Sequence, residues 1–212
     1  MPGIFDEPEQ PERRTPTLAD LRADLAATSW NDNLTPAFEP IPQPSLPQKQ
    51  KQGFLGEDLM ARTATGRGEI ILDYASGIED TNKGGADLVT LAEKEGELCV
   101  VLYDNKAVKA DAVGSVTALR ANRDANIESL RTRWQDIVAD DRRAPAEVAL
   151  FREALSCLDA QPPRVDLVVT NHNSLATRLT SSVEADGIRF EDMAGNTTSP
   201  TGGGGPGPRI FR

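Results

Sequence analysis

The stretch Gly84–Ala107, GGADLVTLAEKEGELCVVLYDNKA, decides the fold of this chain. Each half alternates or runs apolar for about the length of a strand, and the polar segment Lys94–Glu97 separates the halves. This pattern predicts a β-hairpin with strands over 86–93 and 98–106, joined by a four-residue turn.

The register of this hairpin suggests a metal site. If Glu93 pairs with Leu98, the same register sets Asp87 directly opposite Asp104, and Lys106 then lies on the face of Asp104. Two carboxylates about 5 Å apart across a strand pair repel each other and destabilise a sheet. A bound cation would reverse the sign of that interaction, so we interpret the hairpin as a candidate metal site.

Helix and strand patterns continue on both sides of the hairpin. Before it, we expect a helix over 53–62 with Leu55, Leu59 and Arg62 on one side, and a strand of about six residues that contains Asp73. After it, the sequence predicts a helix over 113–138, a helix beginning at Pro145, a strand over 164–171, a helix over 174–187 and a strand over 187–193. The apolar stripe of the first of these helices consists of Val116, Leu119, Ile127, Leu130, Trp134 and Ile137. This order predicts an α/β fold, an α+β sandwich in which helices flank a mixed sheet.

The two ends of the chain differ in composition from the middle. Residues 1–51 hold nine of the fifteen prolines and one short amphipathic helix after Thr17, running to about Thr28, whereas 196–212 are rich in glycine. We therefore divide the chain into a Pro-rich extension, a domain over 52–195 and a tail. The extension is a linker with a docking helix, or alternatively a segment that packs across the domain or joined it to a larger protein.

Composition excludes several classes of protein. No apolar run approaches the roughly 18 residues that span a membrane, and the N-terminus lacks the features of a signal peptide, so we expect a protein folded in the cytoplasm. Cys99 and Cys157 are the only cysteines and are expected to be buried apolar residues, while the single His172 argues against a histidine-based zinc site. The formal charge of −10 argues against a general nucleic-acid binder, although 105–134 are locally basic.

The order of elements and two short motifs resemble the PD-(D/E)XK nuclease superfamily. The motifs are Gly85–Asp87 at the start of the second strand and Asp104–Lys106 at the end of the third, and the resemblance covers about 53–171. With Asn122 and Asn126 in the next helix, the pattern is most similar to nuclease domains of bacterial polymorphic toxins and secreted effectors. The first Pro of the family motif is missing. The resemblance implies a restriction-endonuclease-like αβββαβ core.

The resemblance also implies a set of metal ligands and a catalytic lysine. Asp87 and Asp104 would hold Mg²⁺ or Mn²⁺ together with the backbone carbonyl of Asn105, and Glu57 from the first helix would be a further ligand. Hard cations prefer such oxygen donors, and they lower the pKa of an attacking water. Lys106 would orient that water or neutralise charge on the phosphate.

Other residues are weaker candidates. Asp73 is a possible additional ligand. The candidate nucleic-acid contacts are Lys109, Arg120, Asn122, Arg123 and Asn126. For Asn122 and Asn126, an exposed polar helix face is an equally good interpretation. Charged residues such as Lys109, Arg120 and Arg123 are usually just solvated.

We therefore expect a metal-dependent endonuclease, with DNA favoured over RNA as substrate. The resemblance implies a toxin or effector that is secreted or delivered into a target cell and neutralised by a cognate immunity protein. Two alternatives stay open: a repair or restriction nuclease of the same fold, and a non-catalytic assembly or adaptor protein that docks through its Pro-rich arm.

Overall fold

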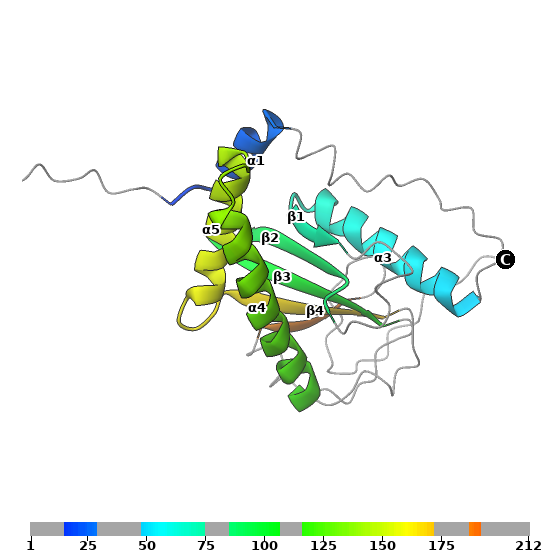
Figure 1. Cartoon of the computed structure of the whole chain (residues 1–212). Helices are drawn as coiled ribbons and strands as arrows, with labels where there is room; N and C mark the ends of the chain where they lie inside the picture. Colours follow the sequence, from blue (N-terminus) through cyan, green and yellow to red (C-terminus); the bar gives the residue numbers. More distant parts are fainter. Residues whose placement is uncertain (1–14, 29–47, 75–84, 107–115, 172–186, 192–212) are drawn as a thin grey trace, which may run out of the picture.

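The computed structural model describes residues 15–28, 48–74, 85–106, 116–171 and 187–191. Its helices are α1 (Leu18–Ala26), α3 (Gln48–Gly66), α4 (Val116–Ala139) and α5 (Pro145–Asp159), and its strands are β1 (Ile70–Tyr74), β2 (Leu88–Lys94), β3 (Glu97–Lys106), β4 (Val165–Asn171) and β5 (Ile188–Glu191). The strands form one five-stranded mixed sheet, with α3 on one face and α4 and α5 on the other (Figure 1). The expected α/β class is confirmed.

The strands follow chain order across the sheet, and one strand runs against the rest. The pairs β1–β2 and β2–β3 are antiparallel, whereas β3–β4 and β4–β5 are parallel. The start of β2 therefore lies at the same edge as the ends of β1, β3, β4 and β5. This edge brings together Asp87, just before β2, and Asp104 near the end of β3.

The central hairpin has the predicted register but a shorter turn. Glu93 pairs with Leu98 as expected, and the ladder continues to Lys94 and Glu97. Only Glu95 and Gly96 form the turn, with φ angles of 55° and 83°. Positive φ at both central residues defines the type I′ turn, whose twist matches that of two paired strands. The prediction of a four-residue turn was therefore wrong.

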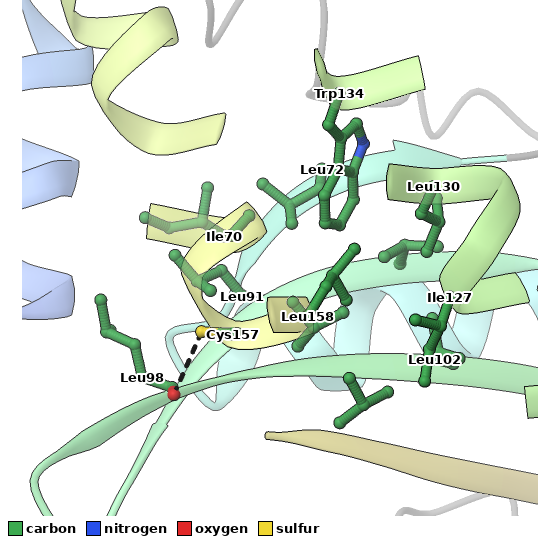
Figure 2. Packing of buried hydrophobic residues seen from close by; sticks show 14 of the residues in the cluster. Ile70, Leu72, Leu91, Leu98, Leu102, Ile127, Leu130, Trp134, Cys157 and Leu158 are labelled. Atoms are coloured by element: carbon green, nitrogen blue, oxygen red, sulfur yellow. Dashed lines mark hydrogen bonds between the residues drawn. The ribbon is translucent and has the colours of Figure 1, made fainter. Parts of the chain in front are cut away.

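One core lies between the sheet and the helices α1, α4 and α5. Trp134 of α4 packs against Phe151 of α5 with ring centroids 5.7 Å apart, which confirms that Trp134 is a core residue. Figure 2 shows this core, in which the thiol of Cys157 donates a hydrogen bond to the carbonyl of Leu98 (3.2 Å). Cys99 and Cys157 are both buried and free, as predicted.

The second core lies beneath α3 and is built on small residues of that helix. Met60, Ala61 and Ala64 are buried against the sheet, whereas Leu59 is 38% exposed. Two alanines let the helix approach the sheet closely, which a face containing Leu59 would prevent. Leu59 therefore lies outside the packed face of α3.

Most remaining elements match their predictions. The strand with Asp73, the two helices after the hairpin, and the strands β4 and β5 are confirmed within a few residues. The short N-terminal helix is confirmed as α1, with Thr17 as its N-cap and Asp20 completing a capping box. The predicted helix over 174–187 lies almost wholly outside the described residues, as does the tail. No helix in the described ranges is both long and apolar enough to cross a membrane.

Candidate metal site

Asp87 lies at a bend immediately before β2 and breaks the register of the hairpin. The last regular pair is Leu88 with Tyr103, and the backbone N–H of Asp87 donates to the carbonyl of the same Tyr103 (2.8 Å). Two consecutive residues thus face one residue of β3, which is the pattern of a β-bulge. The prediction that the register sets Asp87 directly opposite Asp104 was therefore wrong.

The bulge nevertheless aims the Asp87 carboxylate at the end of β3. Its Oδ2 accepts the backbone N–H of Asn105 at 2.6 Å. A short hydrogen bond to a carboxylate is among the stronger hydrogen bonds in proteins. The start of β2 is therefore tied to the residue that follows Asp104.

Asp104 is a buried acid, with only 4% of its surface exposed. It pairs with Val169 of the parallel strand β4. Leu98, Val100 and Leu102 point into the core beneath α4 and α5, so strand alternation sets Asp104 on that same face. Burying a carboxylate is costly unless polar groups or a cation compensate for its charge.

Asn105 and Lys106 complete the third-strand motif at the end of β3. Asn105 accepts a hydrogen bond on Oδ1 from the Thr170 hydroxyl of β4 (3.3 Å). Lys106 ends β3 and its backbone pairs with Asn171, while its side chain lies outside the described part of the structure.

Glu57 of α3 lies close to Asp87. Burial, together with the negative charge of Asp87, raises the pKa of Glu57 to about 7. Burial and the like charge of Asp87 both disfavour the charged form of Glu57, and a cation between the two carboxylates would relieve that repulsion. The helix therefore contributes an acid whose charge is coupled to that of Asp87.

These donors fit a cation that keeps much of its water. Within the described ranges, no three Asp, Glu, His or Cys side chains lie close enough together to hold a metal by themselves. Mg²⁺ is commonly bound by one or two carboxylates plus waters and substrate phosphates, not by an all-protein cage. Glu57 and Asp87 are two carboxylates of this kind. Asp104 directly precedes Asn105, the residue whose backbone binds Asp87.

The two predicted asparagines make contacts within the protein. The side chain of Asn126 is buried, its Oδ1 accepts the backbone N–H of Ala86 (3.0 Å), and its Nδ2 donates to the carbonyl of Asn122 (2.9 Å). The Nδ2 also reaches Oδ1 of Asn122 at 3.3 Å. Asn126 therefore connects α4 to the residue before Asp87.

The basic residues around α4 are largely matched by acids. Arg123 pairs with Asp124 (3.2 Å), and Arg133 pairs with Asp73 (2.8 Å), which commits this weaker candidate ligand to an ion pair. Arg120 is exposed on α4, and Lys109 lies outside the described residues. Much of the positive charge expected in this segment is thus neutralised locally.

A cavity of about 740 Å³ opens at the other end of the sheet, beside the hairpin turn. Lys94, Leu98, Arg123, Arg164 and Asp166 are among its lining residues. None of the predicted metal ligands lines this cavity, whereas Arg123, a predicted nucleic-acid contact, does.

A buried polar network beneath α3 was not predicted from the sequence. Glu69, just before β1, accepts hydrogen bonds from the hydroxyls of Thr90 (2.5 Å) and Tyr103 (2.8 Å). Arg67 lies 4.0 Å from Glu69 and also binds Glu191. Burial raises the pKa of Glu69 and of Tyr103. The available signal was the presence of polar side chains, Thr90 and Tyr103, at strand positions that face the core.

The chain was compared with protein families, curated proteins and solved structures. No family model matches the chain, and no curated protein or solved structure matches it significantly.

Proposed function

We propose that this chain is a divalent-metal-dependent nuclease that hydrolyses phosphodiester bonds, with DNA favoured over RNA. The observation that supports this most is the hydrogen bond between the Asp87 carboxylate and the backbone of Asn105. It joins the two motifs, Gly85–Asp87 and Asp104–Lys106, at one edge of the sheet, although they are separated in sequence by the whole hairpin.

Each residue has a defined task in this proposal. Asp87 and Asp104 would hold Mg²⁺ or Mn²⁺ together with the Asn105 carbonyl, and Glu57 would contribute through a water bound to the ion. When bound, such an ion polarises a phosphate and lowers the pKa of a coordinated water. Lys106 would orient the attacking water or neutralise charge that develops on the phosphate oxygens.

We further propose that the nuclease is a toxin or effector controlled by an immunity protein. This part rests on the similarity of Asp104–Lys106 and the following helix to effector nuclease domains, and on the Pro-rich segment 1–51. A repair or restriction nuclease is the nearest alternative. A neighbouring gene for a methyltransferase or helicase would favour that alternative, whereas a small neighbouring gene whose product binds and inhibits this chain would favour the toxin.

A cleavage assay with matched variants tests the enzymatic proposal. The purified chain is incubated with supercoiled plasmid and with tRNA, in Mg²⁺, in Mn²⁺ and in EDTA. We expect Asp87→Ala, Asp104→Ala and Lys106→Ala each to lower cleavage by at least about 100-fold, because even outer-shell changes at metal sites cost about 10- to 100-fold. Asp136→Ala, an exposed acid on α4, is the matched control and should cleave normally.

Two results would contradict the proposal. Cleavage that persists in EDTA would exclude the metal mechanism, and cleavage that persists in Asp104→Ala would exclude the site. If the folded wild-type chain cuts neither nucleic acid, and Asp104→Ala changes no phenotype, the non-catalytic adaptor becomes the better assignment.

A further inference from the structure

The segment that carries Asp87 is held by three hydrogen bonds that do not belong to the regular ladder. The N–H of Ala86 donates to Oδ1 of Asn126 (3.0 Å), and the N–H of Asp87 donates to the carbonyl of Tyr103 (2.8 Å). The Asp87 carboxylate in turn accepts the N–H of Asn105 (2.6 Å). Two of these contacts come from β3, and only the contact with Asn126 comes from a helix.

The side chain of Asn126 is suited to this contact. Its Oδ1 accepts from Ala86 while its Nδ2 donates to the carbonyl of Asn122 one turn earlier, so the two ends of the amide point in fixed directions. The residue is only 7% exposed, which limits competition from water. Gly85 lies next to the Asn126 side chain: a Cβ added at Gly85 would be 3.9 Å from Oδ1 of Asn126.

An anchor of this kind matters because a bulge lacks regular pairing. The backbone around Asp87 has left the β2–β3 register, so the ladder alone does not fix the direction of its carboxylate. A buried hydrogen bond from a long, packed helix supplies the missing restraint. Residues that orient a ligand-bearing group commonly tune metal affinity without touching the ion.

We propose that Asn126 is the positioning residue for Asp87: it holds Ala86 so that the adjacent carboxylate meets Asn105 and the cation. The inference rests on the proposed metal site, but it assigns Asn126 a task other than contact with nucleic acid. It also gives α4 a role in the site beyond covering the core.

The test uses two readouts on the full chain. One is the affinity for Mn²⁺ alone, measured by calorimetry, and the other is the amide proton of Asn105, followed by NMR without metal. Asn126→Leu removes both polar contacts at similar volume, and Asn126→Asp keeps an acceptor for Ala86. Ile127→Ala, at the next buried position of α4, is a destabilised control that leaves Asn126 in place.

We expect Asn126→Leu to weaken Mn²⁺ binding by about 10-fold and to shift the Asn105 amide proton upfield as its hydrogen bond loosens. Asn126→Asp keeps the acceptor for Ala86 but loses the donor to Asn122, so its Asn105 amide proton should lie closer to the wild-type position than that of Asn126→Leu. Ile127→Ala should lower the thermal midpoint and change neither readout. If Asn126→Leu does not fold, the shorter Asn126→Ser removes the same acceptor at less steric cost and should behave in the same direction.

Different failures have different meanings. If Asp87→Ala binds Mn²⁺ as tightly as the wild type does, the proposed metal site is wrong. The Asn105 amide proton in Asn126→Leu would still test the positioning role of Asn126. An unchanged Asn105 amide in a folded Asn126→Leu protein would overturn the inference. So would an equal loss of Mn²⁺ affinity in Ile127→Ala, because the effect would then reflect stability in general.

Discussion

Arg67 and Glu191 form a bidentate ion pair on the α3 face of the sheet. Arg67 follows α3, Glu191 ends β5, and the two guanidinium–carboxylate contacts measure 3.1 Å and 2.8 Å. The side chain of Glu191 is 5% exposed and that of Arg67 is 33% exposed. A buried acid at one edge of the sheet is thus paired with a cation that is itself partly exposed.

Removing that cation should be costly. Arg67→Ala leaves the charge of Glu191 buried, and breaking a buried pair from one side commonly costs about 3–5 kcal/mol. Because Arg67 is partly exposed, we expect a loss of about 2–3 kcal/mol, measured by urea unfolding. Arg142→Ala, which breaks an exposed pair with Asp140, should have a much smaller effect, because water screens an exposed ion pair. Equal losses in the two variants would contradict this account.

Tyr103→Phe should destabilise the chain in a pH-dependent way. The Tyr103 hydroxyl donates to Glu69, and loss of one partner from a buried polar group costs about 1–3 kcal/mol. Burial raises the pKa of Glu69, while this hydrogen bond lowers it, so the variant should raise that pKa further. The loss should therefore be larger at high pH, where Glu69 is charged, than at low pH, where it is protonated. Urea unfolding at both ends of the range measures the difference, and a loss independent of pH would contradict it.

The local pattern of the sequence was sufficient for most of the fold. Glu93 pairs with Leu98 because alternation in both strands leaves one register that buries the apolar side chains. The packed face of α3 was harder to predict, since the close approach of a helix to a sheet depends on small residues such as Ala61 and Ala64. A large apolar residue such as Leu59 does not indicate the packed face of its helix when its side chain is exposed.

The site was predictable only in part, because its geometry depends on contacts distant in sequence. The bulge at Asp87 involves Tyr103, Asn105 and Asn126, and no local pattern encodes that set. In the same way, the pairing of Arg133 with Asp73 depends on how α4 crosses the sheet. Residue type indicated the candidate groups, while tertiary packing determines where they point.

Glu57→Gln should change how stability varies with pH. The folded chain holds the Glu57 proton up to about pH 7, whereas the unfolded chain releases it near 4.5. Between these values the unfolded state binds fewer protons, so this group lowers the stability of the wild type as pH rises. Glutamine does not titrate, so the variant should gain stability relative to wild type across that window. Unfolding curves in EDTA at several pH values measure this, and a constant difference between the two proteins would contradict it.

A bound cation should stabilise the folded chain through Asp87. Any ligand that binds only the native state adds RT ln(1 + [L]/Kd), or about 2.7 kcal/mol at 100 times Kd. We expect Mn²⁺ to raise the thermal midpoint of the wild type, because it relieves the repulsion between Glu57 and Asp87. Asp87→Ala should lose most of this shift, while Asp136→Ala should keep it, and NaCl of equal ionic strength controls for screening. An equal Mn²⁺ shift in Asp87→Ala and Asp136→Ala would mean that the ion binds elsewhere on this acidic protein, and the proposed site would then be wrong.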